Sequence, residues 1–234
     1  LINYIGQEGI GGTPFPYIEA MEVTLADNVT LVTRTMAQWI VYSFDAEGNK
    51  LAEYVLDEDI LPSAGEGTIM SLDAVIPGQD SDIIFVKTDY YKNQIEQENA
   101  QDADYRFHMS SVHWIDIGTG ELGGTVELPP ALRTSGVSQL FNKEEEEAIQ
   151  YLLGVSAGGF LFLLSPSAEN IYNLALVDLS GMVVHRGEII LEDDDTMYRT
   201  FYVSADGILS AFIGGKLGAE VVLWRTDRYL GKEE

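Results

Sequence analysis

Trp39-Ile40-Val41-Tyr42-Ser43-Phe44-Asp45 is followed by Ala46-Glu47-Gly48-Asn49 and then by a second apolar run over residues 50–56. β-Branched and aromatic residues crowd both runs, which is typical of strands. Between them, Gly48 can take a positive φ without strain, and Asp45 or Asn49 can cap the turn through its side chain. The stretch therefore predicts a β-hairpin.

The same hairpin pattern recurs along the chain, each time as an apolar strand ending near an acid, a turn and a second strand. Self-similarity at a regular spacing indicates a repeat architecture. The other copies are Val112-His113-Trp114-Ile115-Asp116 with Gly118-Thr119-Gly120 and residues 121–128, Leu174-Ala175-Leu176-Val177-Asp178 with Leu179-Ser180-Gly181 and residues 182–191, and Val221-Val222-Leu223-Trp224-Arg225-Thr226-Asp227 near the chain end.

Two further strand candidates precede each of these stretches, so that three repeats hold four short strands and the last repeat, which stops at Tyr229-Leu230-Gly231, holds three. The further candidates are residues 17–25 and 29–36, 68–76 and 82–89, 151–156 and 160–165, and 198–204 and 208–213. Four strands per repeat are what a β-propeller blade requires, because blades that pack face to face bury their faces and leave only short edges. We therefore predict an all-β fold, a β-propeller with four blade-like four-stranded repeats.

The predicted repeats cover approximately residues 17–56, 68–128, 150–191 and 197–231, with residues 1–5 as a lone outer strand. We expect the whole chain, 1–234, to form either a single β-propeller domain or the C-terminal part of one. In the second case, the complete ring would have six or seven blades. The lone strand either completes the last blade of a closed ring or finishes an earlier blade lost by truncation. The start at Leu1, without a Met, favours truncation, and any targeting segment would be lost with it.

Two insertions interrupt the repeats. Residues 90–104 are polar and separate the middle strands of the second repeat, and residues 129–150 carry a proline pair and an acidic run. We expect both to form loops over one rim, with a helical turn or two within residues 139–151.

Composition restricts the classes of partner. The net charge is -25, from 38 acidic against 13 basic residues. Such a surface repels nucleic acid and anionic membranes, attracts basic partners or divalent cations, and keeps the chain in solution. The chain has no cysteine, which excludes disulfides and thiolate chemistry. No apolar stretch approaches the ~18 residues that a transmembrane helix needs.

The loop Tyr4-Ile5-Gly6-Gln7-Glu8-Gly9-Ile10-Gly11-Gly12-Thr13-Pro14-Phe15 resembles the loop between blades of NHL-type propellers, and Phe44-Asp45-Ala46-Glu47-Gly48 resembles the end of a strand in that family. Together with Glu220-Val221-Val222-Leu223-Trp224-Arg225-Thr226-Asp227-Arg228, these stretches are similar to an uncharacterised family of spirochaete propeller proteins that are secreted or lipid-anchored. The resemblance implies missing N-terminal blades, an extracytoplasmic location in the periplasm or cell envelope, and a lipid anchor upstream. It supplies no catalytic residues.

Candidate catalytic groups are sparse. The histidines are His108, His113 and His185, and the odd offset between the first two places them on opposite faces of one strand. No Gly-x-Ser-x-Gly elbow occurs, and the glycines of residues 6–12 lack the Lys and Ser or Thr of a phosphate loop. We therefore predict no catalytic residue and no cofactor-binding residue.

Two acidic clusters and three tryptophans are the remaining candidates. Glu192-Asp193-Asp194-Asp195 and Asp57-Glu58-Asp59 could bind Ca²⁺ through oxygen atoms, but neither has the EF-hand spacing, so a solvated loop is favoured and the metal remains unknown. Trp39, Trp114 and Trp224 lie in the third strand of their repeats, where packing is favoured over a sugar-binding groove.

The sequence thus favours a non-catalytic extracytoplasmic propeller that binds a protein, peptide or glycan through one rim. A propeller hydrolase or lyase remains the alternative, with carboxylates, histidines or a metal gathered from several blades in the central channel. A passive structural piece of an envelope assembly is a third alternative.

Overall fold

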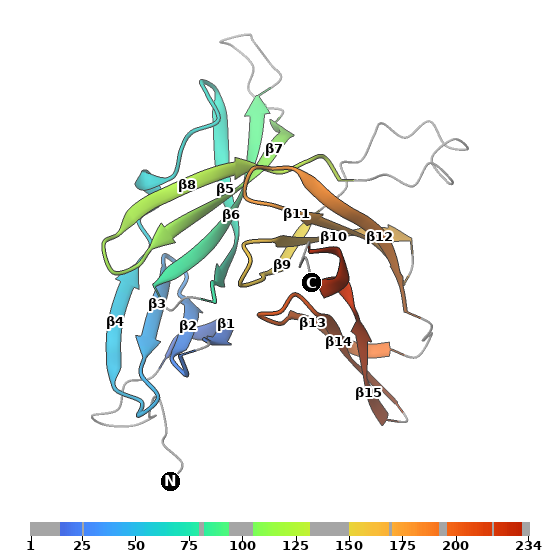
Figure 1. Ribbon diagram of the computed structural model, residues 1–234. Helices are drawn as coiled ribbons and strands as arrows, with labels where there is room; N and C mark the ends of the chain where they lie inside the picture. Colours follow the sequence, from blue (N-terminus) through green and yellow to red (C-terminus); the bar gives the residue numbers. More distant parts are fainter. Residues whose placement is uncertain are drawn as a thin grey trace. The chain divides into compact units, whose positions relative to one another are not determined.

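The computed structural model describes residues 15–24, 26–79, 82–93, 105–131, 150–168, 170–191, 196–216 and 218–230 (Figure 1). Apart from two short 3-10 helices, its regular elements within these ranges are β-strands. Every sheet is an antiparallel meander in which strands pair in chain order, as in a propeller blade. The all-β, β-propeller prediction is confirmed, with four blades. That the whole chain forms one domain stays a prediction.

The first three sheets have four strands each, and the last sheet has three. The first sheet contains β1 (Tyr17–Val23), β2 (Val29–Arg34), β3 (Trp39–Phe44) and β4 (Lys50–Val55). The second contains β5 (Thr68–Pro77), β6 (Ile83–Asn93), β7 (Tyr105–Asp116) and β8 (Glu121–Glu127). The third contains β9 (Tyr151–Val155), β10 (Leu161–Ala168), β11 (Ile171–Val177) and β12 (Val183–Ile190). The last contains β13 (Thr196–Val203), β14 (Leu209–Gly215) and β15 (Gly218–Trp224), and the 3-10 helices are η1 (Glu58–Ile60) and η3 (Thr226–Tyr229).

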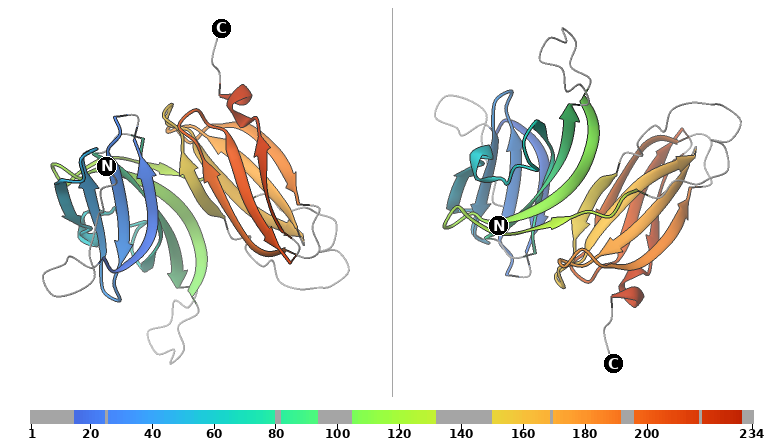
Figure 2. Two further views of the ribbon diagram at one scale, coloured as in Figure 1. Left: turned by 90° about the horizontal axis from the view of Figure 1, so that it is seen from below. Right: turned by 90° about the horizontal axis from the view of Figure 1, so that it is seen from above.

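The chain divides into two compact units, residues 1–125 and 126–234. In the first unit, one apolar cluster joins the first and second sheets, and Val41, Ile84 and Ile115 in it have no exposed surface. In the second unit, a cluster that includes Phe162 and Leu209 joins the third and last sheets, which lie face to face (Figure 2). Each core therefore forms between two sheets, because one sheet alone cannot cover its apolar face.

In each of the first three sheets, the acid at the end of the third strand closes the turn that follows. Asp45 Oδ1 accepts a hydrogen bond from the Asn49 amide at 2.8 Å, and Asp178 Oδ1 accepts one from the Met182 amide at 2.9 Å. Gly48, with a φ of 84°, takes the left-handed position that the turn requires. The hydrogen bond from the Asn49 side chain lowers the pKa of Asp45. The repeated acid-and-glycine pattern is thus local turn chemistry.

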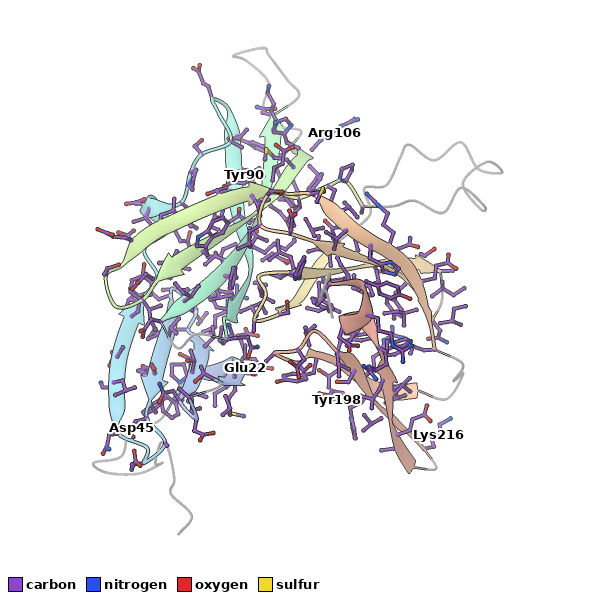
Figure 3. All side chains as sticks on the ribbon, viewed as in Figure 1. Glu22, Asp45, Tyr90, Arg106, Tyr198 and Lys216 are labelled. Carbon is purple, nitrogen blue, oxygen red and sulfur yellow. The ribbon has the colours of Figure 1, made fainter. Side chains whose placement is uncertain are left out.

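The strands on either side of the first predicted insertion are longer than the sequence suggested. Residues 90–93 belong to β6 and residues 105–111 to β7, so the predicted loop over residues 90–104 is wrong at its start. Tyr90 is 2% exposed, and its hydroxyl donates a hydrogen bond to the Pro62 carbonyl at 2.6 Å (Figure 3). This long-range contact holds the end of β6 in the sheet.

The predicted helical turn within residues 139–151 falls mostly outside the described residues. Its last residue, Tyr151, begins β9 as a strand residue, which corrects that end of the prediction. Elsewhere, no helix in the described ranges is long and apolar enough to cross a membrane.

We predict that Gly124→Ala destabilises the first unit by about 1–3 kcal/mol, because a new methyl group would overlap the Trp114 ring. A Cβ at Gly124 would overlap Trp114 Cζ2. Urea titrations followed by circular dichroism measure the change. Gly218→Ala, which meets nothing within 4 Å, is the control and should change the free energy of unfolding by less than about 0.5 kcal/mol.

A second arm isolates the contact with the ring. In a Trp114→Leu background, the cost of Gly124→Ala should shrink, since the overlapping ring atoms are gone. An unchanged cost would show that the packing of Trp114 on this glycine is not the cause.

Candidate functional site

The last sheet carries an exposed apolar surface. We call the side chains of Tyr198, Tyr202, Phe212, Val221 and Leu223 the apolar face; they are 60%, 48%, 43%, 63% and 64% exposed. Register places them together, since Tyr202 lies opposite Ser210 and Ser210 opposite Leu223, while Phe212 lies opposite Val221. Figure 3 labels Tyr198 at this sheet. The described partners in these rows carry no charge, so the surface is apolar across all three strands.

The apolar face arises because the last sheet is apolar on both sides. Alternate residues point to opposite faces of a strand, and the set between those of the apolar face enters the core. Val203, Leu209 and Ala211 belong to that buried set, with at most 3% exposure. Alternation with polar residues, usual for a half-solvated sheet, is therefore missing here. Exposed apolar patches of this kind mark interaction sites more often than scattered single residues do.

The first sheet handles its outer side differently. Leu31, Tyr42 and Phe44 form a buried cluster there, and Phe15 packs against it. The Phe15 ring lies 5.2 Å from that of Tyr42 and 5.9 Å from that of Phe44, both edge-on. Leu31, Tyr42 and Phe44 are 4–8% exposed, although the outer strands β1 and β4 keep Met21, Val23, Leu51 and Val55 43–61% exposed. The first sheet is thus covered over its central strands, whereas Phe212 on the central strand of the last sheet is 43% exposed, which makes the last sheet the better candidate site.

His113 is fully buried and surrounded by hydroxyl groups. Its Nε2 lies 2.8 Å from Thr88 Oγ1 and 3.3 Å from the Tyr90 hydroxyl, and its Nδ1 lies 2.8 Å from Thr125 Oγ1. Burial lowers the pKa of His113 to about 4, which keeps the ring neutral. Both ring nitrogens are thus used in the fold, as the interpretation of an ordinary strand histidine requires.

The other two histidines lie in different surroundings. His108 is exposed, and the ring of His185 stacks on that of Tyr229 with centroids 3.6 Å apart. The described residues contain no group of three or more His, Asp or Glu side chains that could hold a metal ion. The structure therefore does not bring the histidines together.

A buried ion cluster is the polar feature that sequence analysis missed. Lys87 is 1% exposed, and its Nζ lies 2.9 Å from Asp73 Oδ2 and 2.7 Å from Asp89 Oδ1. Ser110 Oγ donates a hydrogen bond to the same Asp89 oxygen at 2.5 Å. The signal was a lysine inside the apolar run of β6 with Asp89 two positions further along the same strand, whereas Asp73 comes from β5. An ammonium held by two carboxylates is no nucleophile, so the cluster is structural.

The acidic clusters give no cation site in the described part of the chain. Asp57 caps η1, its Oδ1 accepting a hydrogen bond from the Asp59 amide at 3.0 Å. This explains the first cluster as a helix cap. Residues 192–195, the second cluster, lie outside the described residues.

The three tryptophans pack separately and form no common groove. Trp39 is 7% exposed in the core of the first unit, and the Arg34 guanidinium lies 4.9 Å from its ring. Trp114 covers Gly124, and Trp224 packs at the edge of the second core, 6.5 Å from Phe201. The packing interpretation is therefore correct for all three.

Comparisons with known proteins add a likeness of fold. No family model and no curated protein matches the chain. It is similar to the acylaminoacyl peptidase of Pyrococcus horikoshii at 14% identity and a TM-score of 0.41, over 89% of this chain and 37% of that one. It is also similar to the β-propeller domain of the trilobed protease from Pyrococcus furiosus, at 13% identity and a TM-score of 0.36, over 89% of this chain and 52% of that one. The PL25 ulvan lyase is similar at 13% identity and a TM-score of 0.37, over 88% of this chain and 51% of that one.

The chain spans 37% to 52% of the length of these three structures. Likeness at this level assigns no activity to the chain. The family resemblance to NHL-type and spirochaete proteins gains no support from these comparisons and stays an expectation from the sequence.

We predict that His113 makes the first unit less stable in acid. The unfolded histidine titrates near 6.5 and the folded one near 4, so the unfolded state binds the extra proton first. The free energy of unfolding should therefore fall as the pH drops from about 6.5 to about 4, by about 3 kcal/mol, and level off below.

Urea titrations of the wild type and His113→Gln across this range measure the effect. Subtracting the two curves removes the contribution of the carboxylates, which both proteins share. Parallel curves for the wild type and His113→Gln would contradict the prediction.

Proposed function

We propose that this chain is a non-catalytic binding protein that holds a protein or peptide ligand on the apolar face of the last sheet. The observation that carries the proposal is the open set of Tyr, Phe, Val and Leu side chains in adjacent cross-strand rows. Exposed aromatic residues beside aliphatic ones are characteristic of the centre of protein interfaces. A ligand that covers these side chains would remove their apolar surface from water, which stabilises the complex through the hydrophobic effect.

A protein or peptide fits this surface better than a glycan. Sugars are held by hydrogen bonds as well as by stacking, so a glycan site needs several polar groups that converge on it. The rows of the apolar face offer the hydroxyls of Thr200, Ser210 and the two tyrosines but no charged or amide group, and Ser210 Oγ already donates a hydrogen bond to the Tyr202 carbonyl. The tryptophans that prompted the glycan hypothesis are engaged in packing.

The alternative of a hydrolase or lyase has no comparable observation behind it. Within the described residues, hydroxyl groups enclose His113 and carboxylates enclose Lys87. Neither side chain is available to a substrate in that state. The binding proposal is therefore favoured over an enzymatic one.

Charge and location complete the proposal. A net charge of -25 favours a basic ligand through long-range attraction, which speeds association at low salt. We also propose an extracytoplasmic location, in the periplasm or cell envelope, with a lipid anchor upstream. The support for that location is the sequence resemblance to the spirochaete family.

Selection from a phage-displayed random peptide library on the immobilised full chain tests the proposed function. We expect enrichment of peptides that combine apolar or aromatic residues with lysine or arginine. The double variant Val221→Lys with Leu223→Lys should lower the affinity for the enriched peptides roughly tenfold or more, because it places charges in the apolar contact.

Leu51→Lys with Val55→Lys is the matched control. These β4 residues are 56% and 43% exposed and undergo the same chemical change on another strand. Circular dichroism verifies that both double variants fold. Equal loss of binding in both variants, or no enrichment by the wild type, would refute the proposal.

A further inference from the structure

Among the described residues, the last sheet has no fourth strand, whereas each of the other three sheets has one. The first three sheets end in β4, β8 and β12, each paired with the third strand of its sheet. In the last sheet, β15 is the third strand, and among the described residues it pairs with β14 alone. One edge of β15 thus presents backbone N–H and C=O groups to which the described chain supplies no strand.

Burial shows how much β15 differs from its counterparts. Val41 in β3, Ile115 in β7 and Leu176 in β11 have no exposed surface. In β15, no residue reaches the buried class, and even its core-side residues Val222 and Trp224 are partly exposed. No described residue therefore covers the free edge of β15, and its side chains on both faces remain at least partly exposed.

We propose that an extended segment of a partner protein pairs with β15 as a fourth strand. This inference rests on the proposed function and deepens it by naming the mode of binding. Strand addition obtains affinity from main-chain hydrogen bonds, and side-chain positions along the added strand give selectivity. The edge and the apolar face then form one continuous site on the last sheet.

The existing fourth strands indicate the side chains that the ligand needs. In β4, Tyr54 lies opposite Val41 and packs against the core, while its neighbour Glu53 points to the other face. In β12, Ile189 is 1% exposed and its neighbour Glu188 is exposed. A ligand beside β15 should likewise place apolar residues next to Val222 and Trp224 and polar ones on the outer face.

Charge selects a basic partner over a second copy of this chain. Each copy carries a net charge of -25, so two copies repel each other as they approach. Glu220 of β15 is itself exposed. A lysine on the outer side of the ligand can lay its methylene groups along Val221 and Leu223 and keep its ammonium in water.

The experiment uses a synthetic peptide that alternates valine with lysine and threonine, added to the full chain. By amide hydrogen exchange, β15 should exchange fast in the protein alone and more slowly with the peptide bound, while β4 stays unchanged. Two further peptides carry N-methyl groups on the valines or on the residues between them. Methylation removes the N–H donors of one strand edge at a time, so one series should lose binding roughly tenfold or more and the other should bind as before.

The outcomes separate this inference from the proposed function. If the peptide binds and Val221→Lys with Leu223→Lys weakens it, but both methylated series bind equally, the peptide lies on the apolar face without pairing. The edge inference then fails and the proposed function stands. If no peptide binds here or in the library selection, the proposed function fails as well.

Two more results test the source of the strand. Slow exchange of β15 in the protein alone would show that the place is already filled, by a second copy if protection depends on protein concentration and by this chain's own segment if it does not. Either finding overturns the assignment to a partner. Replacing the lysines of the peptide by glutamates should weaken binding roughly tenfold at low salt, and equal affinity would overturn the basic character of the partner.

Discussion

A meander of antiparallel strands points its side chains alternately to two faces, and an apolar face stays stable only where a second layer covers it. This requirement organises both units. In the first unit, Val41 of the first sheet and Ile84 of the second sheet belong to one apolar cluster, and neither side chain has exposed surface. In the second unit, Phe162 of the third sheet and Leu209 of the last sheet share a cluster in the same way. Each buried aliphatic or aromatic side chain of this kind contributes ~1.5–3 kcal/mol relative to exposure. The cores thus depend on pairs of sheets and not on any one repeat.

His113 and Lys87, two polar groups inside these layers, are engaged with neighbouring polar side chains. His113 has a hydroxyl at each ring nitrogen, and Lys87 has a carboxylate on two sides. Buried groups of this kind must be paired because an unpaired one loses its hydration without compensation. Their pairing serves the fold and leaves them without a free lone pair or proton for substrate.

A feature could be predicted from the sequence when the residues that form it are close together in the chain. The turn after Phe44 depends on Asp45, Gly48 and Asn49, which lie within a few positions of each other. The sequence pattern therefore predicted this turn. The extension of β6 depends on the contact between Tyr90 and Pro62, and the tolerance for Lys87 depends on Asp73, fourteen positions away. No local pattern contains those contacts. The even spacing of Tyr198 and Tyr202, and of Val221 and Leu223, indicated that these residues share a face of their strands. Whether that face is exposed depends on what covers the sheet, and the spacing alone does not predict this.

The open edge of β15 differs from a sheet edge built to stay solvated. Protein edges commonly carry lysines, prolines or inward-pointing charges that prevent another strand from pairing. The edge strand β4 has Lys50 and Glu53, which pair with each other at 2.6 Å. In β15 there is no lysine or proline, and Glu220, which lies opposite Ile213 on the core side, is the single charged residue. Val221, Val222 and Leu223 follow it in succession, so this part of β15 carries apolar residues toward both faces, like Ile171–Val177 in β11. Its edge is therefore defended by one charge near its beginning, and the apolar run beyond Glu220 is the part suited to pairing with another strand.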